Sequence, residues 1–328
     1  IRLWLTGEHD SDMSDAAGTL WLDVARRDWS EGLLAATGLT RDHMPRLVEG
    51  TEISGTLRAP LARAWGMSRV PVAGGGGDNA ATACGMGVVA PGHGFLSLGT
   101  SGVVFAATER FAVNTDEAVH SFCHAVPATW HQMGVILSAT DSLAWLGEIM
   151  GRSPAALIAL LPARIDRPSP LGFLPYLSGE RTPHNDPDAC GAFWGMRRDA
   201  GPADMVLAVL EGVAMAIAES VDALRRAGAA PEAVYAVGGG ARASQWLDVI
   251  AAITGVHLLK PEGGEVSAAA GAARLAMAAT TGDVSNSVFA RPAIASQVAP
   301  VPELAERYAA KRDAFRRLHP AISRAARP

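Results

Sequence analysis

Three glycine-rich turns, each placed directly after an apolar run, constrain the fold of this chain more than any other feature. They occupy residues 74–77, 99–102 and 238–240. The apolar runs before them have the length and the bounding residues of buried strands. The segments after the first and third turns have the composition of helices. Strands that alternate with helices in this way indicate an α/β fold.

The rest of the chain continues the same alternation. We expect a hairpin from 95–98 and 103–106, and a helix or strand over 19–28. Further strands are expected over 69–73, 130–137, 171–177 and 233–237, and helices from Ser30 to Gly38 and over 141–150, 204–228, 244–255, 267–279 and 304–318. No period of 20–50 residues repeats, which excludes a solenoid. Pro91 and Gly94 mark a candidate domain boundary.

Asp78 and Asn79 follow the first glycine run. Glycines let the backbone approach a ligand closely, so a carboxylate placed directly after them can act as a general base toward a substrate hydroxyl. The alternative is an ordinary glycine-rich turn in which Asp78 is the N-cap of the next helix. The residues alone leave both interpretations open.

The other two turns are typical of anion-binding loops. Residues 97–102 contain a hairpin tip, 99–102, with two hydroxyls and two glycines, and residues 238–242 connect a strand to a helix. Backbone N–H groups at such positions favour negative charge, although tight connections of this kind are also common without a ligand. Taken together, the three turns predict a ligand with phosphates and a flat base. It is not a P-loop, because no glycine is followed by lysine.

Two other patterns suggest different chemistry. Gly85, Gly87 and Ala90 match the spacing of a dinucleotide-binding turn, but they end a helical pattern, and the next acidic residue is Glu109. A Rossmann dehydrogenase is therefore the weaker alternative. His120, Cys123 and His124 have a spacing that could hold a metal, but no second ligand pair is evident, so structural packing is favoured.

A polar run at 180–186 is dense in donors and acceptors. It is either an active-site loop or a turn that satisfies its own polar groups, and we favour the functional interpretation slightly.

Composition narrows the function further. The net charge of −5 argues against a nucleic-acid partner bound by bulk electrostatics. The sequence contains no uninterrupted apolar stretch of 18 residues, so a membrane span is not expected, and the chain does not open on a charged leader. Three cysteines without a paired spacing favour a reducing compartment. We therefore expect a cytoplasmic protein with small-molecule partners, and leave a homodimer open.

These motifs resemble the FGGY family of carbohydrate kinases over the whole chain. The resemblance rests on residues 75–81, 96–102, 120–125, 173–185, 238–242 and 271–276, and on the spacing from Gly191 to Glu211. It implies an actin-like, hexokinase-type (ribonuclease H-like) α/β fold of two domains with a cleft between them. Residues 1–92 would be the remainder of an incomplete N-terminal sugar-binding domain, and 93–328 the C-terminal nucleotide-binding domain.

The resemblance also implies a reaction and a set of roles. The γ-phosphoryl group of Mg-ATP would pass to a sugar hydroxyl, O5 of D-xylulose. Asp78 would be the catalytic base and Asn79 a sugar contact. The nucleotide would be held by Gly99, Thr100 and Gly102 at the β- and γ-phosphates, by Gly239, Gly240 and Ser244 at the adenosine, and more loosely by Thr140 and Asp141. Mg²⁺ is implied by the family and by the charge of ATP, with no metal ligand assigned in this chain.

The chain opens at Ile1 on what reads as the end of a helix. It departs here from the family, whose members begin with a strand, a Gly-Thr phosphate loop and an acidic residue for Mg²⁺. We expect a further stretch of roughly 100–200 residues, and no sugar phosphorylation by this chain alone. The alternatives are a kinase for ribulose, gluconate or glycerol, or a catalytically silent sugar- or nucleotide-binding regulator. Retention of Asp78 with both later glycine loops argues against the silent regulator.

Overall fold

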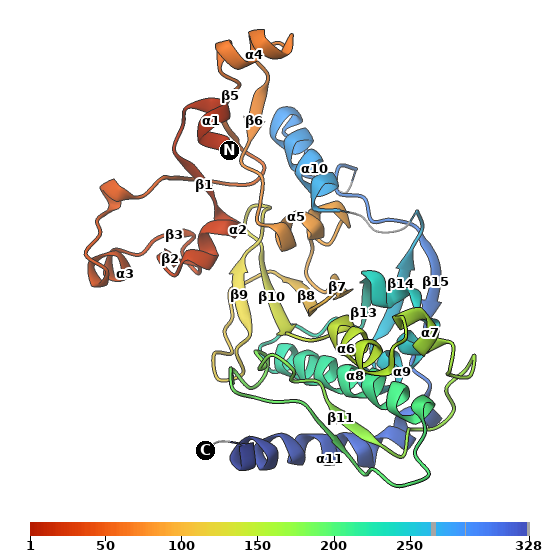
Figure 1. The fold of residues 1–328 in the computed structure, drawn as a ribbon. Coiled ribbons are helices and arrows are strands. Elements are labelled where there is room, and N and C mark those ends of the chain that lie inside the picture. Colours follow the sequence, from red (N-terminus) through yellow and green to blue (C-terminus); the bar gives the residue numbers. More distant parts are fainter. Residues whose placement is uncertain (264–266, 286, 327–328) are drawn as a thin grey trace.

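A seven-stranded mixed sheet forms the centre of the computed structural model, which describes residues 1–263, 267–285 and 287–326 (Figure 1). Its strands are arranged in the order β15-β14-β13-β7-β8-β10-β9. Their bounds are β7 Gly94–Leu98, β8 Gly102–Thr108, β9 His120–Cys123, β10 Trp130–Ile136, β13 Ala233–Val237, β14 His257–Pro261 and β15 Ile294–Val298. Strand β7 pairs parallel with β13 and antiparallel with β8, so the hairpin tip and the residues after β13 lie at the same edge of the sheet.

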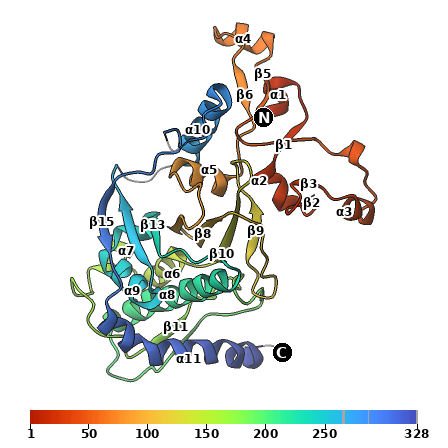
Figure 2. The ribbon, with the colours of Figure 1, turned by 180° about the vertical axis from the view of Figure 1, so that it is seen from behind.

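Helices cover both faces of this sheet, as two views from opposite sides show (Figures 1 and 2). One face carries the main core, in which Leu96, Leu98 and Val104 pack with α8 and α9. On the other face Phe95 and Phe105 pack with Ala83 and Met86 at the end of α5. Alternate residues of β7 therefore point to opposite faces, as the period of a strand requires. The helices concerned are α5 Asp78–Gly85, α6 Thr140–Met150, α7 Pro154–Ile158, α8 Pro202–Arg226, α9 Ser244–Thr254, α10 Ala268–Thr281 and α11 Pro302–Ala326, with a 3-10 turn η3 at Gly239–Arg242.

The first seventy residues form short elements that lie beside α5 and β9. Strand β1 (Asp10–Asp12) pairs parallel with β4 (Arg46–Val48), and β5 (Ile53–Thr56) pairs antiparallel with β6 (Pro71–Ala73). The remaining elements are α1 Arg2–Thr6, α2 Met13–Ala16, η1 Ala17–Thr19, β2 Leu22–Asp23, β3 Asp28–Trp29, α3 Glu31–Ala36, η2 Arg41–His43, α4 Ala59–Trp65, and, later in the chain, β11 Gly172–Leu174 and β12 Ala192–Trp194. The segment β5–α4–β6 projects from the body (Figures 1 and 2).

Most expected elements are present, and the differences have local causes. Residues 19–28 form neither one helix nor one strand, because two-residue strands β2 and β3 pair across a turn. The strand expected over 69–73 begins only at Pro71 and is not buried. The strand expected over 171–177 ends at Leu174. Ser30 accepts the N–H of Leu33 and caps α3, as the sequence predicts.

No helix in the described part of the chain is both long enough and apolar enough to cross a membrane.

Candidate active site

Asp78 is the first residue of α5 and its side chain is exposed to solvent. Gly77 takes the N-cap position, so the alternative in which Asp78 caps the helix is wrong. Oδ1 of Asp78 accepts hydrogen bonds from the backbone N–H of Asn79 at 2.7 Å and from its side-chain amide at 3.0 Å. Oδ2 accepts none from the described residues. A carboxylate held through one oxygen and open at the other is suited to take a proton from a hydroxyl.

Two of the glycines before Asp78, Gly74 and Gly76, are required by the close approach of other segments. A Cβ on Gly74 would lie 2.2 Å from the carbonyl oxygen of Glu49, and one on Gly76 would lie 2.9 Å from Cβ of Ala125. Arg2 also donates to the carbonyl of Gly74. The run is therefore packed against two other segments, and side chains there would move Asp78.

A hydrogen-bonded relay that the sequence does not reveal reaches the residue before Asp78. The N–H of Gly77 donates to Oγ of Ser14 at 2.9 Å, and that hydroxyl donates to Oδ1 of Asp12 at 2.8 Å. Asp12 is 2% exposed, and burial raises the pKa of its carboxyl. Asp12 also caps α2 by accepting the N–H of Asp15. The start of α2 thus fixes the start of α5.

The hairpin tip at Gly99, Thr100 and Ser101 is docked on the start of α6. The carbonyl of Gly99 accepts the N–H of Thr140 at 3.0 Å and its hydroxyl at 2.8 Å, and the carbonyl of Thr100 accepts the N–H of Ala139 at 2.8 Å. The N–H groups of residues 99–101 donate to no acceptor in the described part of the chain. Free N–H groups at an exposed turn are a suitable site for phosphate oxygens.

The turn after β13 completes this side of the site. Gly238 has φ +91°, and a Cβ there would lie 2.6 Å from the backbone of Leu98. A Cβ on Gly240 would lie 2.9 Å from Leu98 and 3.0 Å from Thr140, whereas one on Gly239 would meet nothing within 4 Å. Gly238 and Gly240 are needed for packing, and Gly239 faces open space.

That open space is a cleft of about 490 Å³. Its walls are formed by α6, α7, η3 and the start of α9, and include Thr140, Ile158, Gly239, Gly240, Arg242 and Trp246. Apolar walls with a few polar groups suit a flat base, and Arg242 adds a positive charge.

The other predicted nucleotide residues lie around this cleft. Gly102 lies near it, because a Cβ there would be 2.7 Å from Ile136 and 3.3 Å from Ala139, which directly precedes Thr140. Asp141 donates its N–H to Thr100 at 3.3 Å. Ser244 is exposed at the start of α9 but does not line the cleft.

The motif at His120, Cys123 and His124, whose spacing could hold a metal, makes its contacts with other parts of the fold. Nε2 of His124 contacts the carbonyl oxygen of Val88 at 3.0 Å, and its Nδ1 accepts the N–H of Val126. Cys123 donates to the carbonyl of Val24, and His120 contacts Arg181. Burial lowers the pKa of His124 to about 4. His124 and Cys123 have partners within the fold, as expected for packing.

The 180–186 loop supports the nucleotide side of the site. Oε1 of Glu180 accepts the N–H of Leu137 at 3.0 Å, three residues before Thr140, and the N–H of Arg181 at 2.7 Å. Oε2 of Glu180 is buried with no hydrogen-bond partner among the described atoms. Burial raises the pKa of this carboxyl to about 8. The loop therefore positions the segment that leads to α6.

Comparison with known proteins agrees with this geometry. Residues 94–280 match the C-terminal domain of the FGGY family of carbohydrate kinases, and residues 1–85 match its N-terminal domain. The chain therefore belongs to the FGGY family of carbohydrate kinases.

Its relatives include the xylulose kinase of Escherichia coli (strain K12), 49% identical over 323 residues, which are 97% of this chain and 66% of that protein. The xylulose kinase of Klebsiella pneumoniae is 48% identical over 320 residues, with the same coverage of both chains. A crystal structure of a xyloylose kinase from Brucella ovis superposes with a TM-score of 0.95 at 50% identity, covering 98% of this chain and 66% of that one. These similarities confirm the expected actin-like α/β fold. The chain spans about two thirds of the length of these relatives.

Proposed function

We propose that the protein is an ATP-dependent sugar kinase that transfers the γ-phosphoryl group of Mg-ATP to O5 of D-xylulose, giving D-xylulose 5-phosphate and ADP. The observation that carries the proposal is that one chain holds both an exposed, half-satisfied carboxylate and a hairpin tip whose N–H groups have no acceptor among the described residues. Phosphoryl transfer requires positioning and charge stabilisation more than covalent chemistry, and these two features supply them. Relatives near 50% identity that are named xylulose kinases support D-xylulose as the acceptor.

Each residue has a defined role in this proposal. Asp78 takes the proton of the attacking hydroxyl at its free Oδ2, and Asn79 fixes the carboxylate and contacts the sugar. The N–H groups at Gly99 and Thr100, beside Gly102, receive the β- and γ-phosphates. Gly239, Gly240 and Thr140 line the adenosine cleft, with Ser244 at its margin. The sugar-binding part extends over residues 1–92 and the nucleotide-binding part over 93–328.

Magnesium enters this proposal with the nucleotide. Within residues 1–263, 267–285 and 287–326, no group of three or more His, Cys, Asp or Glu side chains could hold a metal ion. Mg²⁺ commonly binds proteins through one or two carboxylates and substrate phosphates, so in this proposal it arrives bound to ATP. When bound, the ion neutralises the phosphate charge. A cytoplasmic location, where ATP is abundant, completes the proposal, and a homodimer remains open.

ADP release by the full-length protein tests this function. Turnover should require both ATP and acceptor, and D-xylulose should give the largest kcat/KM in a panel with ribulose, gluconate and glycerol. Preference for another acceptor would move the protein to a different specificity within the family. Binding of sugar and ATP without turnover would show a silent regulator instead.

The 328 residues, assayed alone, are expected to release no ADP, because they span only about two thirds of the length of the related xylulose kinases. Turnover by this chain would contradict that part of the proposal.

A further inference from the structure

A second set of contacts, distant from Asp78 in the sequence, joins two segments that contact the glycine run at residues 74–77. Its centre is Arg27, whose guanidinium forms a two-point ion pair with Glu49, with Nε to Oε1 at 3.0 Å and Nη2 to Oε2 at 2.5 Å. The side chains are 12% and 17% exposed, so this pair is largely shielded from water. Bidentate pairs of this kind fix geometry as well as charge.

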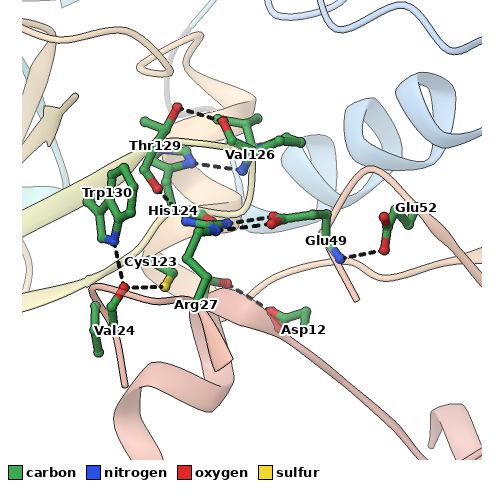
Figure 3. A network of polar contacts seen from close by, with 12 residues as sticks. Asp12, Val24, Arg27, Glu49, Glu52, Cys123, His124, Val126, Thr129 and Trp130 are labelled. Carbon is green, nitrogen blue, oxygen red and sulfur yellow. Dashed lines mark hydrogen bonds and ion pairs between the residues drawn. The ribbon is translucent and has the colours of Figure 1, made fainter. Parts of the chain in front are cut away.

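The same guanidinium also donates hydrogen bonds to the turn between β9 and β10 (Figure 3). Nη1 of Arg27 donates to the carbonyl of Thr129 at 2.8 Å, and Nη2 reaches the carbonyl of His124 at 3.4 Å. The guanidinium carbon lies 5.4 Å from the ring centroid of Trp130, a distance typical of a cation–π contact. Arg27 therefore joins two segments that are far apart in the chain, the turn beginning at Glu49 and the β9–β10 turn.

The glycine run passes between these two segments. A Cβ on Gly50 would lie 2.4 Å from the carbonyl oxygens of both Ala125 and Gly75. The N–H of Gly75 donates to Gly50 at 3.1 Å, and that of Gly74 donates to Glu52 at 2.8 Å. Ala125 also packs in one cluster with residues of α5. Both segments joined by Arg27 thus contact the glycine run directly, the first at Gly74 and the second at Gly76.

We propose that Arg27 and Glu49 are positioning residues for Asp78, because their ion pair holds the residue 49–52 turn and the β9–β10 turn together around residues 74–77. This inference rests on the proposed function, in which Asp78 takes the proton of the sugar hydroxyl. Neither Arg27 nor Glu49 lines the proposed nucleotide cleft. A small displacement of a catalytic group can cost two orders of magnitude in rate.

The test compares Arg27→Met with Asp78→Ala in the full-length protein. Arg27→Met should lower kcat about 10- to 100-fold and leave the Kd for ATP unchanged within about twofold. In the Asp78→Ala background the same change should cost nothing further, because the group it positions is gone. Arg41→Met is the matched control, since Arg41 pairs with Asp28 and Glu31 at an exposed site and should leave kcat within about twofold.

Two measurements keep the outcome clear. Hydrogen exchange at the amides of Gly74, Gly75 and Gly77 should become about 10-fold faster in Arg27→Met and stay unchanged in Arg41→Met, whether or not the protein turns over sugar. If Arg27→Met does not fold, Glu49→Gln keeps the size of the partner and should show the same pattern more weakly. Unchanged kcat and exchange, or losses that multiply with Asp78→Ala, would overturn the proposal. A wild-type protein without sugar turnover would instead refute the proposed function.

Discussion

The two halves of the candidate site are built in different ways. The nucleotide side joins the hairpin tip, the start of α6 and the turn after β13, where Gly99 is hydrogen-bonded to Thr140 and Gly240 lies against the side chains of Leu98 and Thr140. The Asp78 side depends on Ser14, Glu49 and Ala125, which come from three separate parts of the chain. The nucleotide side is thus built at the ends of neighbouring strands of the main sheet, whereas the Asp78 side is held by α2, the residue 49–52 turn and the β9–β10 turn.

This difference has a functional consequence. A substitution on the nucleotide side should change the affinity for ATP, whereas a substitution around Asp78 should change kcat with ATP affinity retained. The following substitutions separate the two kinds of effect.

Asp78→Asn should have the largest effect. The amide keeps the shape of the side chain but cannot take the proton, so kcat should fall by about 10²–10⁴ with nearly unchanged ATP binding. Steady-state ADP release and calorimetric titration with ATP measure the two quantities. Asp15→Asn removes a neighbouring exposed carboxylate beside Gly77 and should leave kcat within about threefold. Equal losses in both variants would show that negative charge, rather than a base, is required.

Gly239→Val tests the nucleotide side alone. A Cβ at this position meets no protein atom within 4 Å, and the position lines the cleft, so the melting temperature without ATP should not change. The KM for ATP should rise about 10-fold, equivalent to about 1.4 kcal/mol, with kcat little altered. Gly32→Val, also at a glycine with open space, is the control. An unchanged KM for ATP would place the adenosine elsewhere.

Ser14→Ala should affect the Asp78 side less strongly. Removing the hydroxyl leaves the N–H of Gly77 without its acceptor, so kcat should fall about 10-fold and the free energy of unfolding by about 1–3 kcal/mol. Ser30→Ala removes the N-cap of α3 and should cost about 1 kcal/mol of stability with no change in kcat. Urea unfolding and kinetics on both variants distinguish positioning from general destabilisation.

Sequence patterns indicate the turns of the proposed nucleotide side because the signals of these turns are local. The hairpin tip and the turn after Val237 are recognisable from glycines that follow apolar strands. The Asp78 side was predicted only at Asp78 and Asn79. The bonds that fix it join residues 63 positions apart at Ser14 and Gly77, and 102 apart at Arg27 and Thr129, and no short motif contains such pairs.

Three short strands of the main sheet were missed by the sequence patterns: β9 and β15 at its two edges, and β14 next to β15. Strand β9 has four residues, and β14 and β15 have five each. Strand β15 is mostly exposed, so it lacks the alternation of buried and exposed residues that marks a half-buried strand. Edge strands of this kind are defined by their pairing with a neighbour, which a single sequence does not show.

Glu180→Gln should have the smallest effect on activity and a pH-dependent effect on stability. The pKa of Glu180 is raised to about 8 by burial, against an ordinary value of 4.5, so the folded protein holds a proton that the unfolded chain releases. The stabilisation from this group is therefore complete below pH 4.5 and is lost as the pH rises toward 8. Glutamine keeps an acceptor for the N–H of Leu137 and does not titrate.

The advantage of the Gln variant in free energy of unfolding should consequently grow between pH 5 and pH 8, by at most about 1.4 kcal/mol per pH unit. Above pH 8 the difference should level off, because both states of the wild type are then ionised. Urea unfolding at several pH values measures this difference, with the exposed Glu109→Gln as a control that should show no such trend. A constant difference would mean that Glu180 is already ionised at neutral pH. The carboxylate beside Leu137 would then be a permanent charge behind the phosphate loop, and the nucleotide side would depend on a buried ion just as the Asp78 side depends on Arg27 and Glu49.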